Sequence, residues 1–183
     1  NVPIVKGDTI IQAPEVSQEG DYTFTFADGT PIQVPFKLNE QQQQALLGLE
    51  KFYNNPEEFN NEIALIGYAG TGKTTIMSLF DKYLMANGII PKYSAPTHRA
   101  NAVTKLNNPT ADVITLHKAF GLNPVVDLTN GQLSLENLES EQSGKPLVSY
   151  GDYLIIDESS MITDQLYEFI EKFKKDSKIK VIY

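Results

Sequence analysis

The chain has 183 residues, of which 41% are hydrophobic and 21% charged, the proportions of a globular domain rather than of a disordered or fibrous chain. It contains no cysteine, which excludes disulfides, thiolate catalysis and cysteine-based zinc sites. The 15 basic and 23 acidic residues give a formal net charge of −8, which argues against a surface that coats nucleic acid but allows a local basic groove. The sequence has neither a basic-then-apolar leader nor an apolar run of bilayer length, so we expect a cytoplasmic protein with no membrane partner.

Residues 1–35 predict a small β appendage. Phe24 and Phe26 alternate with polar or small residues, Asp28 and Gly29 have the composition of a hairpin turn, and residues 32–34 return as a second strand. Pro31 has no backbone N–H to donate, so it places the returning strand at a sheet edge.

From residue 36 onward, predicted helices and strands alternate. Asn39 is a good N-cap for a first helix, and the run Asn54, Asn55 and Pro56 ends it. We then expect strands at Ile63–Ile66, Tyr93–Ala95, Val113–Leu116, Tyr153–Asp157 and Ile179–Tyr183, and helices at Lys73–Ala86, Arg99–Leu106 and from Thr163 to about Lys175. Repeated units of a strand followed by a helix predict the α/β class, with a parallel sheet covered by helices on both faces.

Residues 67–74 read GYAGTGKT and satisfy the phosphate-loop pattern G-x-x-x-x-G-K-[ST], between a predicted strand and a predicted helix. Glycines let the backbone wrap a phosphate, and the helix N-terminus presents unpaired N–H groups to it. In this motif Lys73 reaches the β- and γ-phosphates of ATP, and the Thr74 hydroxyl ligates Mg²⁺. A glycine-rich turn before a chance lysine is the alternative, and the strand and helix around it argue against that. The predicted nucleotide-binding residues are Gly67, Ala69, Gly70, Thr71, Gly72, Lys73, Thr74 and Thr75.

The apolar run at residues 153–156 ends in two adjacent carboxylates, Asp157 and Glu158. Such a strand places them at the carboxyl edge of the sheet, where open α/β folds bind ligands. We expect Asp157 to hold Mg²⁺ through water and Glu158 to orient and polarise an attacking water. The alternative is a loop that begins with two solvated charges. The predicted catalytic residues are therefore Lys73, Asp157 and Glu158, with Thr74 and Asp157 as metal ligands and ATP and Mg²⁺ as cofactors.

Four motifs carry a resemblance to a known family: residues 67–75, 95–100, 115–117 and 157–161 occur in its order and approximate spacing. The chain resembles superfamily 1 DNA helicases of the RecD/Dda type, in the 5′-to-3′ branch. About residues 36–183 match their first RecA-like P-loop NTPase domain, and residues 1–35 lie outside the match. The resemblance implies Mg²⁺-dependent ATP hydrolysis, coupled in the complete protein to translocation on DNA and to its unwinding. It leaves open a role in replication, repair or recombination.

In that family the segments matched by residues 95–100 and 115–117 contact single-stranded DNA. Residues 91–120 hold four basic residues and one acidic residue, together with both histidines of the chain. Hydroxyls and backbone N–H groups there can hold phosphates without reading bases. The predicted DNA-binding residues are Pro96, Thr97, His98, Arg99, Thr115 and His117, and the expected partner is single-stranded DNA or a DNA junction. A hydrogen-bonded core histidine is the alternative for His117; a two-histidine metal site would lack a nearby carboxylate pair.

Gln42 aligns with the glutamine that reads adenine in these helicases. A local alternative is a capping box, in which the Gln42 side chain folds back on the backbone N–H of Asn39. One carboxamide cannot readily do both jobs well.

Residues 121–150 occupy the place where these helicases insert a small β domain with a strand-separating pin. A hairpin is predicted within residues 124–135, with Asn130 and Gly131 as a type I′ turn. The alternative is an ordinary surface hairpin, because no large aromatic residue stands at its tip.

The family's second RecA-like domain, normally in the same chain, supplies the arginines that act on the γ-phosphate. We therefore expect residues 1–183 alone to be incomplete for turnover. The alternative function is a non-catalytic, nucleotide-dependent module that binds single-stranded DNA.

Overall fold

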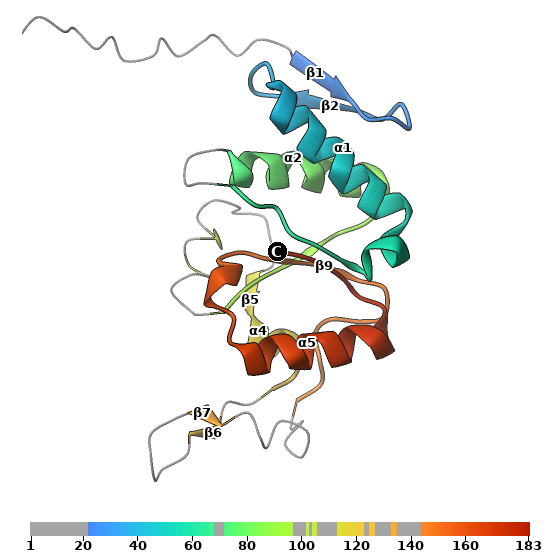
Figure 1. The fold of residues 1–183 in the computed structure, drawn as a ribbon. Coiled ribbons are helices and arrows are strands. Elements are labelled where there is room, and N and C mark those ends of the chain that lie inside the picture. The colour runs from blue at the N-terminus through green and yellow to red at the C-terminus, as the bar shows by residue number, and fades with distance from the viewer. Residues whose placement is uncertain are drawn as a thin grey trace, which may run out of the picture.

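The computed structural model describes residues 22–67, 72–96, 102, 104–105, 113–122, 125–126, 133–134 and 144–183. Its centre is a five-stranded parallel sheet in the order β3-β9-β8-β4-β5 (Figure 1). The strands are β3 (Glu62–Ile63), β4 (Lys92–Ala95), β5 (Val113–Thr115), β8 (Tyr153–Ile156) and β9 (Lys180–Ile182). The helices are α1 (Glu40–Asn54), α2 (Lys73–Ala86), α4 (Leu116–Ala119) and α5 (Asp164–Ser177), with short 3-10 turns at η1 (Pro56–Phe59) and η2 (Ser159–Met161).

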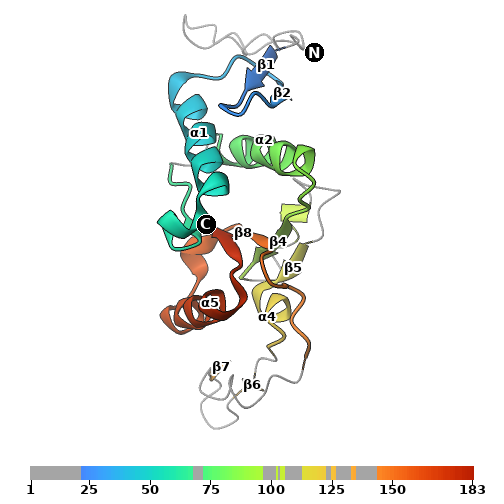
Figure 2. The same cartoon turned by 90° about the vertical axis from the view of Figure 1, so that its right-hand side faces the viewer.

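The sheet is buried on both faces, and its side chains alternate between two cores. On β8, Tyr153 and Ile155 pack into the core under α1 and α2, whereas Leu154 and Ile156 pack into the core with α4 and α5. All four side chains are buried. Figure 2 shows α1 and α2 on one side of the strands and α4 and α5 on the other. The predicted α/β class, with a parallel sheet covered on both faces, is confirmed.

Local capping sets the ends of the helices. Asn39 and Gln42 form a complete capping box at the start of α1, and the Thr163 hydroxyl accepts the Leu166 N–H at the start of α5. Helix α2 begins and ends at the predicted residues, and Gly88 follows it with a φ of +77°. Its N-cap, Gly72, has a φ of +88°, and among the described residues no side chain caps this helix. The first turn of α2 therefore keeps N–H groups for another acceptor.

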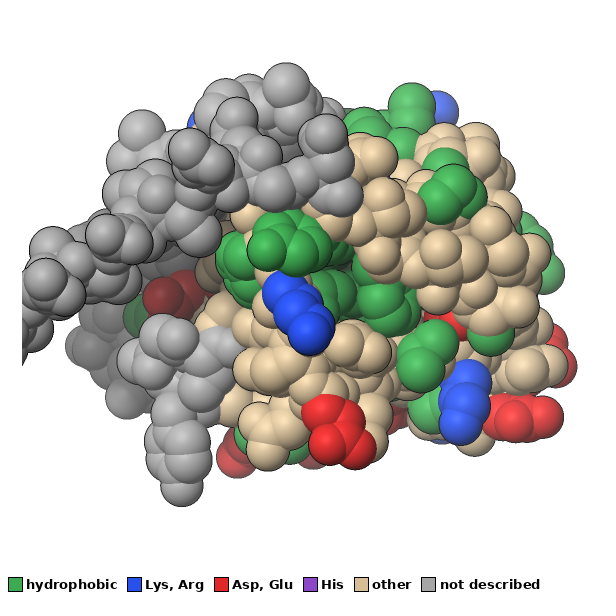
Figure 3. Space-filling view, turned by 90° about the horizontal axis from the view of Figure 1, so that it is seen from above, with side chains coloured by type: hydrophobic (Ala, Val, Ile, Leu, Met, Phe, Trp, Pro, Cys, Tyr) green, Lys and Arg blue, Asp and Glu red, His purple; other side chains and the backbone are tan. Residues whose placement is uncertain are grey.

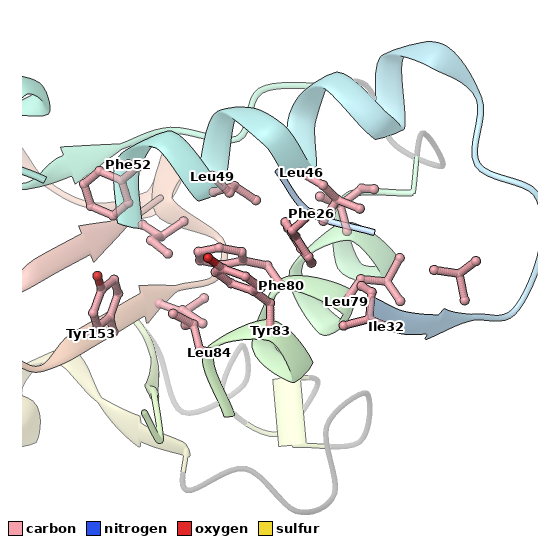
Figure 4. Close-up of a cluster of buried hydrophobic side chains, with 14 of the residues drawn as sticks. Phe26, Ile32, Leu46, Leu49, Phe52, Leu79, Phe80, Tyr83, Leu84 and Tyr153 are labelled. Carbon is pink, nitrogen blue, oxygen red and sulfur yellow. The ribbon is translucent and has the colours of Figure 1, made fainter. Parts of the chain in front are cut away.

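The N-terminal hairpin is observed as predicted, with β1 (Tyr22–Thr25) antiparallel to β2 (Pro31–Val34). It shares the core of the domain: Phe26 and Ile32 are buried against α1 and α2, and the Phe26 and Tyr83 ring centroids are 4.0 Å apart (Figure 4). Residues 1–21 lie outside the described residues.

A buried carboxylate holds the turn of this hairpin. Glu50 on α1 is 2% exposed, and its two oxygens accept the backbone N–H groups of Ala27 and Asp28 at 2.9 Å each. The Tyr83 hydroxyl on α2 donates to Asp28 Oδ2 at 2.9 Å. The hairpin is thus tied to both helices by polar contacts as well as by apolar packing.

All five sheet strands differ from the prediction by one or more residues at an end, and two of these differences have a visible cause. The strand expected at Ile63–Ile66 is Glu62–Ile63, and Ile66 is 91% exposed; the pairing continues only as far as the Leu65 N–H, which donates to the Tyr183 carbonyl. The strand expected at Val113–Leu116 ends at Thr115, because the Thr115 hydroxyl accepts the Lys118 N–H and starts α4. Of the helix expected at Arg99–Leu106, the described residues 102, 104 and 105 are helical, and the rest lies outside the described residues.

The predicted insertion contains a short antiparallel pair, β6 (Val125–Val126) with β7 (Leu133–Ser134), beyond α4 and α5 in Figure 1. Val126 lies opposite Leu133, whereas an unbroken ladder from a two-residue turn at Asn130 and Gly131 would set it opposite Leu135. Asn130 and Gly131 lie outside the described residues.

The two chain segments at the base of this insertion, near Gly121 and Gly144, lie against each other. Gly121 has a φ of +70°, and a Cβ atom there would clash with the Gly144 carbonyl and lie 2.9 Å from the Pro146 nitrogen. The N–H groups of Leu147 and Val148 both donate to the Ala119 carbonyl at the end of α4. The base of the insertion is therefore fixed to α4.

Figure 3 views the molecule from the side of the hairpin and α1. Its charged side chains are scattered and of both signs, between hydrophobic ones, so this face does not resemble a nucleic-acid-coating surface. Within the described ranges, we find no helix both long and apolar enough to cross a bilayer.

Candidate active site

A cavity of about 530 Å³ opens at the carboxyl edge of the sheet, a volume within the usual range for small-molecule sites. Parallel strands bring the ends of β3, β4, β8 and β9 to this edge. The lining includes polar groups that can contact a phosphate, a cation or a water molecule, from Gly67, Lys73, Thr74, Thr104, Asp157 and Glu158. The predicted residues Gly67, Lys73 and Thr74 thus share one cavity with Asp157 and Glu158, whereas Gln42, Gly72 and Thr75 are not part of its lining.

Lys73 is the first residue of α2 and closes the phosphate loop on itself. Its ammonium donates to the Gly67 carbonyl at 2.6 Å, across the base of the loop. Thr74, beside it, is exposed and lines the cavity. Ala69, Gly70 and Thr71 lie outside the described residues. A cation, a hydroxyl and the N-terminus of α2 therefore face the same space, which fits a bound phosphate group.

The two polar atoms of the Gln42 carboxamide have different neighbours. Oε1 accepts the Asn39 N–H at 3.0 Å, while the Asn39 side chain accepts the Gln42 N–H at 2.9 Å. Nε2 lies 3.2 Å from where a Cβ atom of Gly72 would stand. The capping box predicted as the local alternative is therefore confirmed, and the contact with adenine stays a prediction.

Asp157 is half-buried, and each of its carboxylate oxygens accepts a hydrogen bond. Oδ2 accepts the Thr104 hydroxyl at 2.7 Å, and Oδ1 accepts the backbone N–H of Glu158 at 3.0 Å. Its own N–H donates to the Ser94 carbonyl on β4 at 2.9 Å. The carboxylate is consequently fixed in orientation and keeps lone pairs for a water-bound cation.

Glu158 differs from its neighbour, because it is exposed and has a φ of +55°. A left-handed backbone is unfavourable for a glutamate and is held there by its surroundings, a pattern common at functional sites.

The donor set fits Mg²⁺ better than a metal held by an all-protein cage. Across the described residues no group of three or more His, Asp or Glu side chains could hold a metal ion. Mg²⁺ commonly takes one or two carboxylates, water and the phosphates of its substrate. Thr74, at the end of the phosphate loop, and Asp157, after β8, both line the cavity and can supply the protein part of such a set.

The predicted DNA-contacting residues that the structure describes lie at the ends of neighbouring strands. Ala95 pairs with Thr115, so Pro96 and α4 follow adjacent strands at the carboxyl edge. Thr97, His98 and Arg99 lie outside the described residues. His117 is half-buried, burial lowers its pKa, and its ring has no hydrogen-bond partner among the described residues. The DNA contact and the core position of His117 both stay predictions.

Two site residues were missed by the sequence reasoning. Thr104 is 1% exposed and Ser94 fully buried; the Ser94 hydroxyl donates to the Ile114 carbonyl at 2.9 Å. A polar residue at an inward helix position was the available signal for Thr104.

Comparisons with known proteins agree with this geometry. The sequence model of the AAA domain family matches residues 37–183. An uncharacterized protein of Acanthamoeba polyphaga mimivirus is 27% identical over 160 residues, which cover 80% of this chain and 32% of that protein. The ATP-dependent DNA helicase dda of Enterobacteria phage T4 is 32% identical over 118 residues, 62% of this chain and 24% of the helicase. The chain thus spans about a third and a quarter of the length of these two relatives. Its phosphate loop, its acidic strand and the match over most of its length show that the chain belongs to the AAA domain family, as a P-loop ATPase of helicase type.

Proposed function

We propose that this chain is the ATP-binding domain of a DNA helicase of the RecD/Dda type, which couples Mg²⁺-dependent ATP hydrolysis to movement on single-stranded DNA. One observation carries the proposal: the nucleotide cavity lies at the edge of the sheet where β4 and β5 end, and the described parts of the two predicted DNA-contacting segments, Ala95, Pro96 and residues 115–117, lie at these strand ends. Strand β4 pairs with β8, which leads to Asp157, and with β5, which leads to Thr115. A nucleotide and a DNA strand bound there would sit on adjacent strand ends.

The residues of the cavity have different roles in ATP hydrolysis. The N-terminus of α2 and Lys73 bind the ATP phosphates and offset their charge. Thr74 and Asp157 hold Mg²⁺, which when bound neutralises charge on the β- and γ-phosphates. Glu158, exposed in the cavity, orients and polarises the attacking water.

The remaining parts of the proposal concern the partners. Pro96, Thr115 and His117 hold the DNA backbone without reading its sequence. A second RecA-like domain closes the cavity and supplies an arginine; Ile66, an apolar residue of the cavity wall, is 91% exposed and suits such a cover. The pair β6–β7 takes the role of the strand-separating pin that the resemblance implies.

Turnover distinguishes this function from a non-catalytic module. A protein that includes the second domain is expected to hydrolyse ATP faster when single-stranded DNA is added. Lys73→Ala should abolish nucleotide binding, whereas Glu158→Gln should bind ATP and hydrolyse it slowly. Lys51→Ala and Glu168→Gln, at exposed helix positions away from the cavity, are matched controls. Full turnover by Lys73→Ala would contradict the proposal, and tight ATP binding with no turnover under any condition would favour the module.

A further inference from the structure

A buried tyrosine and a half-buried aspartate face each other beside the nucleotide cavity, and the chemistry proposed above uses neither of them. Tyr93 on β4 is 3% exposed, and Asp81 lies on α2. Burial raises the pKa of Asp81, and the facing Tyr93 hydroxyl lowers it by less. Within the described ranges, neither Asp81 Oδ1 nor the Tyr93 hydroxyl makes a hydrogen bond of normal geometry. A buried polar atom without a partner costs free energy, so it requires an explanation.

Tyr93 is also part of the nucleotide cavity. It lines the cavity together with Thr74 and Asp157, the two residues that can hold Mg²⁺. Its pKa is raised first by burial and then by the negative charges of Asp81 and Asp157, so its hydroxyl lies in the field of both carboxylates. Asp81 follows Thr74 and Met77 at helical spacing and lies on the same face of α2, two turns further along the helix. The unpartnered hydroxyl is therefore near the carboxylate that is expected to act on the cation.

The chemistry of the pair indicates which kind of group would complete it. A phenol hydroxyl donates one hydrogen and accepts through its oxygen, whereas an ionised carboxylate only accepts. Once Tyr93 donates to Asp81, its own oxygen can be satisfied only by a donor. The phosphate oxygens of a nucleotide are acceptors and cannot fill that place. A water bound to Mg²⁺ directs a lone pair at the metal and donates its hydrogens outward, and Mg²⁺ usually keeps several such waters.

We propose that Tyr93 is a positioning residue for the hydrated cation: its hydroxyl donates to Asp81 and accepts a hydrogen bond from a water of the Mg²⁺ that Thr74 and Asp157 hold. Asp81 acts on the cation only through Tyr93. Part of the affinity for Mg·ATP then comes from supplying the donor that the Tyr93 oxygen lacks within the fold. This inference rests on the proposed function, because it requires Mg²⁺ in this cavity.

Equilibrium titration of residues 1–183 with a fluorescent ATP analogue, in Mg²⁺ and in EDTA, tests the proposal. The quantity compared is the Mg²⁺ gain, the ratio of the two affinities, in which a general change in repulsion of the nucleotide cancels. Tyr93→Phe removes only the hydroxyl, and Asp81→Asn keeps the shape of the side chain without its charge. Tyr153→Phe, the same change at a buried position of β8 outside the cavity lining, is the matched control. Urea denaturation measures the stability of each protein without ligand.

Tyr93→Phe is expected to reduce the Mg²⁺ gain by about two- to tenfold, the range for loss of one hydrogen bond, and to leave the affinity in EDTA unchanged. Without ligand this variant should be at least as stable as the parent, because an unpartnered oxygen is removed from a buried position. Asp81→Asn should reduce the Mg²⁺ gain by a smaller factor. The double variant should lose no more than Tyr93→Phe alone, because Asp81 acts through the hydroxyl. Tyr153→Phe should keep the parental gain.

A parental Mg²⁺ gain in Tyr93→Phe would overturn the inference, and so would losses that simply add in the double variant. Equal losses of affinity in Mg²⁺ and in EDTA would indicate a merely structural role. A Tyr93→Phe protein that is less stable than the parent, or does not fold, would show that the hydroxyl has a partner within the fold, and a parental Mg²⁺ gain in Asp81→Asn would exclude the role of the carboxylate. All these outcomes leave the proposed function intact. A parent that binds no nucleotide, or whose affinity does not rise with Mg²⁺, would overturn the proposed function as well.

Discussion

The Glu50 carboxylate allows the attachment of the N-terminal hairpin to be tested quantitatively. Its two oxygens accept the N–H groups of Ala27 and Asp28 at 2.9 Å each, and the side chain is 2% exposed. A hydrogen bond to a charged group contributes about 1.5–3 kcal/mol to stability. Both bonds are only partly buried, so the sum must be discounted for water that can replace them. We expect Glu50→Ala to lower the free energy of unfolding by about 2–4 kcal/mol.

Glu50→Gln is expected to have a smaller effect, since one oxygen can still accept while the amide nitrogen faces a second donor. Chemical denaturation in urea, followed by far-UV circular dichroism, measures both losses. Glu58→Gln, at an exposed position on η1, is the control and should stay within about 0.5 kcal/mol of the parent. If Glu50→Ala unfolds at the parental midpoint, the hairpin is not held by this carboxylate and the reasoning is refuted.

Two further predictions use matched positions. Gly121→Ala should lose about 2 kcal/mol more stability than Gly88→Ala: both glycines have positive φ, but only at Gly121 does backbone meet the new Cβ atom. Equal losses of stability for the two variants in urea denaturation would contradict the close approach of Gly121 to Gly144. Burial lowers the pKa of His117 below its ordinary value of 6.5, so the unfolded chain binds the proton more readily and stability should fall as pH drops below about 6.5. His117→Gln should show a weaker loss between pH 7.5 and 5.5; an unchanged pH dependence would rule out this contribution.

Patterns confined to neighbouring residues were predictable from the sequence. The capping pair Asn39 and Gln42, the full length of α2 and the alternation along β8 all depend on contacts within one element or on a period of two or 3.6 residues. The adjacency of the phosphate loop to Asp157 followed from the general geometry of parallel sheets.

Features that depend on distant partners were not predictable. Glu50 reads as a solvated helix residue until the turn at Ala27 and Asp28 is folded against it. Thr104 is buried with its hydroxyl donated to Asp157, which lies far along the chain. Ile66 belongs to an apolar run typical of a strand, yet it is exposed because pairing with β9 stops at Leu65.

The state of the Gln42 carboxamide leads to a prediction about nucleotide choice. Adenine presents an acceptor at N7 and a donor at N6, whereas guanine presents acceptors at N7 and O6. A free carboxamide can accept from N6 and donate to N7, and so select adenine. In the structure Oε1 already accepts the Asn39 N–H, so accepting from N6 as well would require its second lone pair and a change in its orientation, whereas Nε2, beside Gly72, can donate with the cap intact.

A carboxamide that only donates can reach N7 of either purine. We therefore expect residues 1–183 to bind Mg·ATP and Mg·GTP with affinities within about tenfold of each other. Two hydrogen bonds from one side chain to a base would favour the correct base by about 1–3 kcal/mol, and the capping box prevents Gln42 from making both. Gln42→Ala should weaken the binding of both nucleotides by the same factor, because half of the capping box beside the phosphate loop is lost. Competition titrations of the fluorescent analogue with ATP and GTP measure the ratio, and Gln44→Ala, also exposed on α1, is the control. A preference for ATP above about a hundredfold that disappears in Gln42→Ala would show that Oε1 leaves the cap when nucleotide binds. In that case the capping box would be a resting state of the site, and the free energy of opening it would be subtracted from the binding free energy of the nucleotide that Gln42 reads, while nucleotides that Gln42 does not read would bind with the cap closed.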